Sequence, residues 1–247
     1  MPIEVVTVQR LYQRVAEQIA RLIASGEYRL GGRLPPERDL ARQLGISRPT
    51  VREAMVALEL AGLVEVRTGA GSYVAAMPAE ARMLPLWLGD SGPGPIELIE
   101  ARRAIEPIVA AAAATRANAD DLAVIEETLA DMLQAADSTS FRAADRRFHQ
   151  RIAQATGNGV FVAMVDNLWS QMFTPIFERL GRRTGLLPEA RETALGEHQE
   201  IAKAIVARDP EAARRAMDTH LGKVQAILCG ESGETAAREA SLAEASK

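Results

Sequence analysis

The 247-residue chain is 47% hydrophobic, 25% charged and only 4% aromatic, so it has enough apolar side chains for one large or two modest buried cores. No apolar run is long enough to cross a membrane, the first residues do not resemble a secretory signal, and a single cysteine, Cys229, excludes an internal disulfide. These features predict a soluble cytoplasmic protein without a membrane partner.

The net charge of -4 is unevenly distributed along the chain. Residues 1–77 contain ten arginines and eight acids, whereas the remainder contains 19 basic and 25 acidic residues. A basic first part followed by an acidic remainder indicates two domains with different partners.

Residues 1–77 are predicted to form three helices followed by a β-hairpin. The second helix starts at "PPER" and ends at Gly45, and the third has Ser47 as its N-cap. The segments "LVEVR" and "SYV" alternate as strands do, around the turn "TGAG". This order is that of a winged helix-turn-helix. The first helix should bury the stripe Leu11, Val15, Ile19, Leu22 and Ile23, and the third helix Val51, Met55 and Leu58.

The start of the third helix is suited to reading DNA. Arg48 and Arg52 lie one helical turn apart with Thr50 between them, and an arginine can donate two hydrogen bonds to O6 and N7 of guanine. Arg38 on the preceding helix is placed to reach the DNA backbone or a neighbouring base. For any one of these arginines the alternative is a solvated helix face. The predicted DNA-contacting residues are Arg38, Ser47, Arg48, Thr50, Arg52, Thr68 and Gly69.

The rest of the chain is predicted to be an all-α antiparallel bundle at 96–230, between a linker rich in proline and glycine at 78–95 and a disordered tail at 231–247. No convincing strand is present in the bundle. Its helices are expected at 96–117, 119–136, 139–156, 159–180, 188–207 and 210–228.

All three histidines of the chain and one acid lie on or beside predicted buried stripes of the bundle. Asp145 and His149 are four residues apart on one helix, and His198 and His220 lie on two others. A single histidine in such a stripe is usually a hydrogen-bonded core residue, but one metal ion inside the bundle accounts for all four side chains. Three imidazoles and a carboxylate suit Zn²⁺, and also Ni²⁺, Co²⁺, Mn²⁺ or Fe²⁺.

Several sequence blocks resemble a known family of bacterial regulators. "LPPERDLA", "SRPTVREAM" and "GLVEVRTGAGSYV" resemble the DNA-binding domain of the GntR family, although "PT" at 49–50 stands where many members have the reverse order. "IELIEARRAIEP", "DRRFH", "EHQEIAKAI" and "ARDPEAARRAMDTHL" resemble the FCD effector domain of its FadR subgroup. The resemblance implies a homodimeric repressor or activator, with a repressor preferred, bound to a palindromic operator in double-stranded DNA.

The resemblance also assigns roles within the bundle. It implies that Asp145, His149, His198 and His220 hold the metal and that a small carboxylate effector meets the ion and Arg102. A structural ion pair with a neighbouring acid is the alternative for Arg102. Arg103 is expected to face solvent or a dimer contact. Asn167 and Trp169 are placed near the effector by position only.

The sequence leaves the identity of the effector undecided and allows two alternative functions. The blocks look most like regulators of hexuronate use, so a sugar acid such as a hexuronate is expected, with lactate, gluconate-like acids and dicarboxylates as alternatives. The metal itself could be the signal, or a metal-dependent hydrolase could activate water at open positions of the ion. No separate general base is recognisable, and an enzyme would leave the DNA-reading part without a use. We therefore expect no enzymatic activity.

Overall fold

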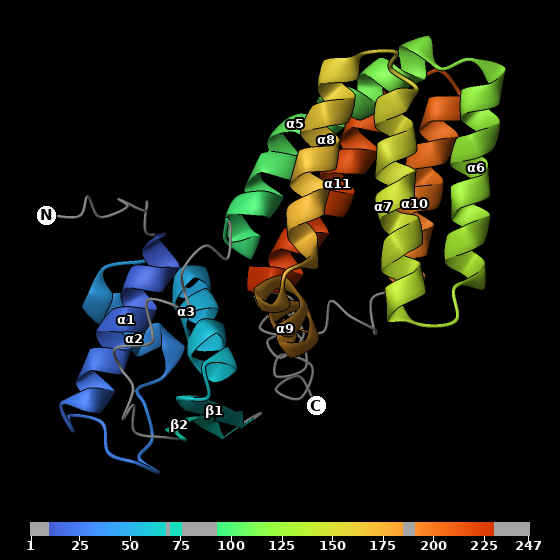
Figure 1. Cartoon of the computed structure of the whole chain (residues 1–247). Helices are drawn as coiled ribbons and strands as arrows, with labels where there is room; N and C mark the ends of the chain where they lie inside the picture. The colour runs from blue at the N-terminus through green and yellow to red at the C-terminus, as the bar shows by residue number, and fades with distance from the viewer. Residues whose placement is uncertain (1–9, 68–69, 76–92, 185–190, 230–247) are drawn as a thin grey trace, which may run out of the picture. The chain divides into compact units, whose positions relative to one another are not determined.

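The structure, a computed structural model, describes residues 10–67, 70–75, 93–184 and 191–229 (Figure 1). The chain divides into two compact units, one comprising Met1–Pro95 with Thr174–Leu180 and the other Ile96–Phe173 with Gly181–Lys247. Residues 76–92, which form most of the predicted linker, and the predicted tail lie outside the described residues, as do Thr68 and Gly69. Among the described helices, none is both long and apolar enough to span a membrane.

The first unit has the predicted order of elements. It contains α1 (Leu11–Ala24), α2 (Glu37–Leu44), α3 (Arg48–Leu60), and an antiparallel hairpin of β1 (Val64–Arg67) and β2 (Gly71–Val74). Gly45 ends α2 with a φ of 67°, a conformation that glycine adopts without steric cost. The Ser47 hydroxyl caps α3 by accepting a hydrogen bond from the Thr50 backbone N–H at 3.3 Å. The winged helix-turn-helix prediction is confirmed.

The core of the first unit agrees with the sequence prediction except at two positions of α1, Leu11 and Leu22, and Leu22 is only partly buried. Val51, Met55 and Leu58 of α3 are buried as expected. Leu11, in contrast, is 50% exposed, and Tyr12 is buried in its place. The buried stripe of α1 shares Val15, Ile19 and Ile23 with the prediction, but it extends over small alanines instead of Leu11 and Leu22. Its members are Tyr12, Val15, Ala16, Ile19, Ala20 and Ile23.

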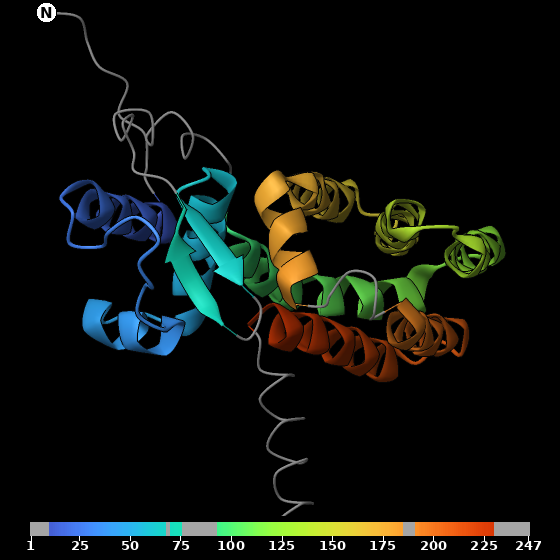
Figure 2. The ribbon, with the colours of Figure 1, turned by 90° about the horizontal axis from the view of Figure 1, so that it is seen from below.

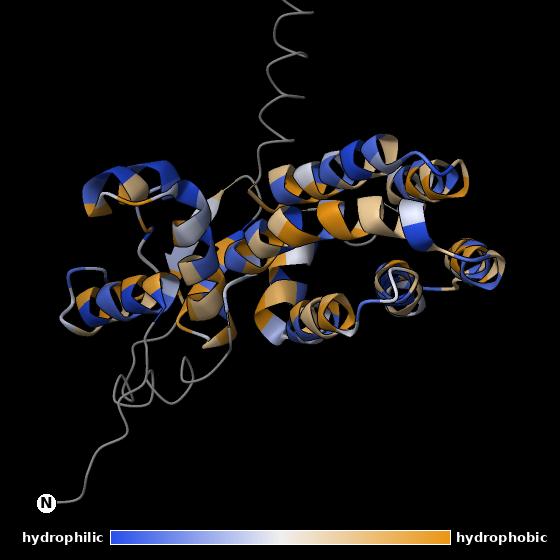
Figure 3. Cartoon of the chain, turned by 90° about the horizontal axis from the view of Figure 1, so that it is seen from above, coloured by the Kyte–Doolittle hydropathy of each residue, from blue (hydrophilic) through white to orange (hydrophobic). Residues whose placement is uncertain are grey.

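The described residues of the second unit form helices joined by short turns, with no strand among them, as predicted. Its helices include α5 (Pro95–Arg116), α6 (Ala119–Gln134), α7 (Ser138–Gln154), α8 (Gly159–Ser170), α10 (Arg191–Val206) and α11 (Pro210–Cys229). Figure 2 shows two layers, with α6, α7 and α8 on one side and α5, α10 and α11 on the other. In Figure 3 hydrophobic and hydrophilic residues alternate around each helix, as expected for amphipathic helices that pack together.

Short polar caps fix where these helices start. Asn118 accepts a hydrogen bond from the Asp121 backbone N–H at 2.9 Å, and Asp137 accepts one from the Ser140 backbone N–H at 2.7 Å. The Asp137 cap sets the start of α7 and hence the direction in which Asp145 and His149 project two and three turns later. The breaks predicted at Asn118 and Asp137 are confirmed.

The prediction of one continuous helix at 159–180 is wrong. Helix α8 ends at Ser170, a 3₁₀ turn η2 follows at Gln171–Phe173, and α9 begins at Pro175 and ends at Thr184. Proline has no backbone N–H to donate to the preceding turn, and its ring disfavours a helical conformation at Thr174. Pro175 therefore ends one helix and starts the next.

Candidate metal centre

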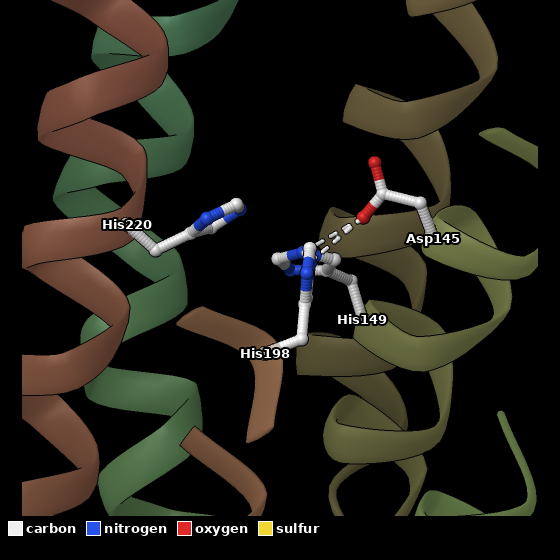
Figure 4. A group of neighbouring side chains, drawn as sticks. All are labelled: Asp145, His149, His198 and His220. Carbon is white, nitrogen blue, oxygen red and sulfur yellow. Dashed lines mark hydrogen bonds and ion pairs between the residues drawn. The ribbon is translucent and has the colours of Figure 1, made fainter. Parts of the chain in front are cut away.

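The structure brings together the four side chains that the sequence singled out. Asp145 and His149 project from α7, His198 from α10 and His220 from α11, and all four point toward one another between the two layers (Figure 4). Their potential ligand atoms lie within 4.8 Å of one another. The imidazoles are buried, whereas the Asp145 side chain keeps 22% of its surface exposed.

Each imidazole has a hydrogen-bond acceptor at Nδ1. His198 Nδ1 lies 2.6 Å from the carbonyl oxygen of Ala194, His220 Nδ1 lies 2.8 Å from a carboxylate oxygen of Glu197, and His149 Nδ1 contacts the carboxylate of Glu106. A carbonyl or an ionised carboxylate can only accept, so each Nδ1 bears the proton. In a neutral ring the opposite nitrogen, Nε2, then offers a lone pair.

The lone pairs converge with a carboxylate oxygen. Nε2 of His149 and Nε2 of His198 are 3.3 Å apart, and Asp145 Oδ1 lies 3.0 Å from His198 Nε2. Asp145 Oδ1 is buried and has no hydrogen-bond donor among the described residues. Acceptors gathered around one point without a donor leave buried polar atoms unsatisfied, which is costly unless a cation lies between them. The residues thus fit a divalent metal ion with three nitrogen ligands and one oxygen ligand.

The pKa values of two ligands support the same interpretation. Burial tends to raise the pKa of Asp145, but the neighbouring imidazoles of His149 and His198 outweigh burial and hold it well below its usual range. Burial, together with the neighbouring His198, lowers the pKa of His220 to about 4. At neutral pH Asp145 is therefore ionised and His220 is neutral, which are the forms that bind a metal.

A third ligand holds its proton more tightly. Burial tends to lower the pKa of His149, but the nearby carboxylates of Glu106 and Asp145 outweigh burial and raise it. A proton therefore competes with a metal ion for this nitrogen more strongly than at His220.

Arg102 lies beside the cluster, in the ion pair that the sequence left as its alternative role. Its Nε donates to Glu106 Oε1 at 2.6 Å, and both side chains are 2% exposed. The guanidinium carbon lies 4.2 Å from the centre of the Trp169 ring, which is a cation–π contact. Nη1 contacts the thioether of Met172, a weak acceptor, at 3.2 Å. One edge of the guanidinium thus bonds Glu106. The other edge faces the Met172 thioether, which a stronger acceptor such as a carboxylate could replace.

The other bundle residues named from the sequence lie elsewhere. Asn167 is exposed, and its side-chain oxygen accepts a hydrogen bond from Gln171 at 3.0 Å, so the structure gives no support to an effector role for Asn167. Arg103 donates to Asp218 at 2.9 Å and to Gln225 at 2.8 Å, so it joins α5 to α11 while its side chain stays 37% exposed. Being one residue after Arg102, it projects to a different side of α5.

Sequence reasoning missed the acids that orient the imidazoles. Glu106 follows Arg102 by one helical turn, and this spacing was the available signal for a shared buried face. Glu197 precedes His198 in the sequence but bonds to His220 on the next helix, a pairing that no local pattern reveals.

The predicted DNA-contacting residues differ in how accessible they are. The Arg38 side chain is 77% exposed, whereas Arg52 is buried and its Nη2 lies 3.0 Å from Glu37 Oε2 on α2. Arg48 is partly exposed, and Thr50 Oγ1 lies 2.7 Å from the Ser47 hydroxyl. Arg48 and Arg52 therefore do not share one environment, although they lie one turn apart.

Comparisons with known proteins give matches to both parts of the chain. The family described as "Bacterial regulatory proteins, gntR family" matches residues 11–74, and the FCD domain matches residues 97–223. The Exu regulon transcriptional regulator of Escherichia coli (strain K12) is 33% identical over 235 residues, which cover 94% of this chain and 89% of that protein. The Uxu operon regulator of Haemophilus influenzae is 35% identical over 226 residues, which cover 90% of this chain and 83% of that protein.

A third relative and one solved structure complete the comparison. The Uxu operon transcriptional regulator of Escherichia coli (strain K12) is 34% identical over 234 residues, with 89% and 87% of the two chains covered. The structure described as "Streptococcus agalactiae GntR" has 28% sequence identity and a TM-score of 0.46, and the match covers 87% of this chain and 99% of that one.

Proposed function

The chain belongs to the gntR family of bacterial regulatory proteins, with an FCD domain, and is a DNA-binding transcription regulator; we propose that a small carboxylate controls it from a metal site in the helical bundle. The observation that carries this proposal is the convergence of three imidazole lone pairs and Asp145 Oδ1 on one buried point. Its relatives are named as transcriptional regulators and not as enzymes.

The chain's own residues would hold the metal as follows. Nε2 of His149, His198 and His220 and an oxygen of Asp145 are the ligands, and the acceptors at each Nδ1 keep the rings in the ligating tautomer. A bound divalent ion such as Zn²⁺ would supply open coordination positions for an oxygen ligand. Ni²⁺, Co²⁺, Mn²⁺ and Fe²⁺ suit the same donors.

The buried charges favour an anion as the effector. Arg102 carries one positive charge, whereas Glu106 and Asp145 carry one negative charge each. A divalent ion therefore leaves one positive charge in a buried site, and a single carboxylate neutralises it. A neutral sugar would leave that charge uncompensated.

Arg102 and Trp169 would recognise a hydroxylated acid in this proposal. The guanidinium edge now facing Met172 can bond a carboxylate oxygen in a fixed planar geometry. The indole N–H of Trp169 is buried and has no acceptor among the described residues, so it can donate to a hydroxyl of the ligand. A hexuronate has both groups, and the resemblance to regulators of hexuronate use and the Exu and Uxu names of the relatives support this choice.

The DNA-binding part is proposed to extend over residues 1–77, with the effector-binding part over 96–230. In a homodimer the two recognition helices would meet a palindromic operator, and Arg38, which is exposed, and Arg48, which is partly exposed, would be available to contact it. Repression by occupancy of the operator is the simplest mode of action.

Calorimetric titration tests the effector proposal. Metal-loaded wild-type protein is titrated with galacturonate, glucuronate, gluconate, lactate and citrate, and with galactose as the neutral control. We expect an acid to bind and galactose not to bind, and we expect His198→Ala to abolish binding together with the metal. Arg102→Lys keeps the charge but loses the planar fork, so it should weaken acid binding and retain the metal. Galactose binding as tight as that of the acids, or acid binding by Arg102→Lys as tight as by wild type, would contradict the carboxylate model.

A further inference from the structure

The buried carboxylate of Glu106 contacts both Arg102, the proposed effector-binding residue, and His149, a proposed metal ligand. Glu106 Oε1 accepts from Arg102 Nε at 2.6 Å, and Glu106 Oε2 contacts His149 Nδ1. Glu106 is 2% exposed, and Arg102 and His149 are equally buried. Helix α5 thus reaches the metal cluster through Glu106, although α5 contributes no residue to the cluster itself.

We propose that Glu106 positions His149 for metal binding and couples the metal ligand to Arg102, so that metal affinity and effector affinity depend on each other. This inference rests on the proposed function and deepens it. Glu106 acts through His149 and Arg102 and touches neither the metal nor the effector.

The positioning role follows from the geometry of the His149 ring. The ring can turn about its side-chain bonds, and only one orientation directs Nε2 at His198 Nε2 and Asp145 Oδ1. The contact from Nδ1 to Glu106 fixes that orientation, and Trp169 packs against the ring with a centroid distance of 5.1 Å. A carboxylate that accepts the Nδ1 proton also makes Nε2 a stronger donor to a metal.

The coupling role follows from the way Arg102 shares its bonds. Its Nε and Nη2 are both directed at Glu106, at 2.6 and 3.4 Å. An effector carboxylate on Arg102 would compete with Glu106 for the positive charge of the guanidinium. Glu106 would then accept the His149 proton more strongly, and Nε2 would bind the metal more tightly. Because linkage is reciprocal, the metal would tighten effector binding by the same factor.

Glu197 provides a matched control in the same cluster. It accepts from His220 Nδ1 at 2.8 Å, as Glu106 does from His149, and its other oxygen lies 2.8 Å from Lys223. The charged partner of Glu197 is thus Lys223, whereas that of Glu106 is Arg102. Glu197→Gln should impair ligand orientation in the same way without changing the link to the effector.

The test is a competition for Zn²⁺ against a chromophoric chelator, with and without galacturonate. Wild type, Glu106→Gln and Glu197→Gln are compared, and each is first melted without metal to show that it folds. We expect both variants to lose about 10- to 100-fold in zinc affinity. Galacturonate should tighten zinc binding by a larger factor in wild type and in Glu197→Gln than in Glu106→Gln, where only the direct contact of the acid with the metal would remain.

A double variant guards against a folding defect. Glu106→Gln leaves the Arg102 charge buried without its partner, so Arg102→Met with Glu106→Gln removes both charges and retains the packing volume. The visible spectrum of the Co²⁺-loaded forms should change in both Glu106 variants if His149 is misaligned. Zinc affinity and cobalt spectra equal to those of wild type would overturn the positioning role. An effect of galacturonate that is as large in Glu106→Gln as in wild type, or is lacking in wild type, would overturn the coupling through Glu106.

The outcome also separates this inference from the function on which it rests. If wild type binds zinc and galacturonate but Glu106→Gln behaves identically, only the role of Glu106 is wrong. If wild type fails to bind zinc at all, the proposed metal site and this inference are both contradicted.

Discussion

At the scale of single residues, Arg52 differs from the other arginines of the DNA-binding unit because its charge is neutralised inside the protein. Its guanidinium bonds Glu37 through Nε at 3.2 Å and Nη2 at 3.0 Å, and only 10% of its side chain is exposed. We therefore expect it to hold α3 against α2, in addition to any contact with DNA.

Arg52→Ala should destabilise the DNA-binding unit, because the carboxylate of Glu37 would be left without this partner in a largely buried position. Breaking a buried ion pair from one side costs up to roughly 3–5 kcal/mol. The control is Arg38→Ala, since the Arg38 side chain is 77% exposed and its replacement should change the unfolding free energy little. Urea denaturation followed by circular dichroism measures both variants. Equal stability of the two variants would show that the Glu37–Arg52 pair is not structural.

Trp169 offers a prediction about ligand recognition. Trp169→Phe keeps an aromatic ring against Arg102 and His149 but removes the indole N–H, which has no acceptor among the described residues. Loss of one hydrogen bond to the effector costs about 0.5–1.5 kcal/mol, so galacturonate affinity should fall roughly 2- to 10-fold. Zinc content should be unchanged. Calorimetry with unaltered galacturonate affinity would contradict a role for this N–H.

At the scale of elements, the four candidate ligands come from three helices, which a bound metal would tie together. Asp145 and His149 belong to α7, His198 to α10 and His220 to α11. A ligand that binds only the folded protein stabilises it by about 2.7 kcal/mol when its concentration is 100 times the dissociation constant.

Removal of the metal should therefore speed hydrogen exchange in α7, α10 and α11, with little change in α1, α2 and α3 of the other unit. Mass spectrometry of loaded and chelator-treated protein resolves these helices. A uniform change across both units would mean that the metal does not act through the cluster, and no change in any helix would mean that none is bound there.

The same scale shows what the sequence could and could not predict. Asn118, Asp137, Ser47 and Gly45 mark helix ends because their effects are local, and the structure places the ends accordingly. The break at Pro175 was missed because apolar periodicity continues across it, although proline itself was the signal. Leu11 was misplaced because the buried stripe of α1 includes alanines that a search for large apolar residues overlooks.

Some residues of the candidate site could likewise be predicted from the sequence, and others could not. Asp145, His149, His198 and His220 could be grouped because all three histidines of the chain lie on helical stripes. The acids that accept hydrogen bonds from Nδ1 could not be predicted in this way. Glu106 and Glu197 meet imidazoles on other helices, and such contacts depend on how the helices pack and not on local spacing.

At the scale of the whole molecule, DNA reading and effector sensing are proposed to lie in different parts of the chain. An effector can change DNA affinity only if it binds two arrangements of the protein with different affinity. The coupling free energy in such systems is typically about 1–3 kcal/mol, or about 5- to 150-fold in DNA affinity. The metal-sensor alternative predicts the same DNA response from the ion alone.

The most direct test of the central claim is the affinity for DNA in defined ligand states. A DNA duplex is selected from a random library by the metal-loaded protein and is then labelled. Fluorescence anisotropy gives the dissociation constant of this duplex from metal-loaded, chelator-treated and His198→Ala protein. Each protein is measured alone, with galacturonate and with galactose. We predict that galacturonate shifts this constant about 5- to 150-fold in the loaded protein only, and that galactose has no effect. The claim would be contradicted if galacturonate acted equally on His198→Ala, or if chelation alone reproduced the full shift and the acid added nothing.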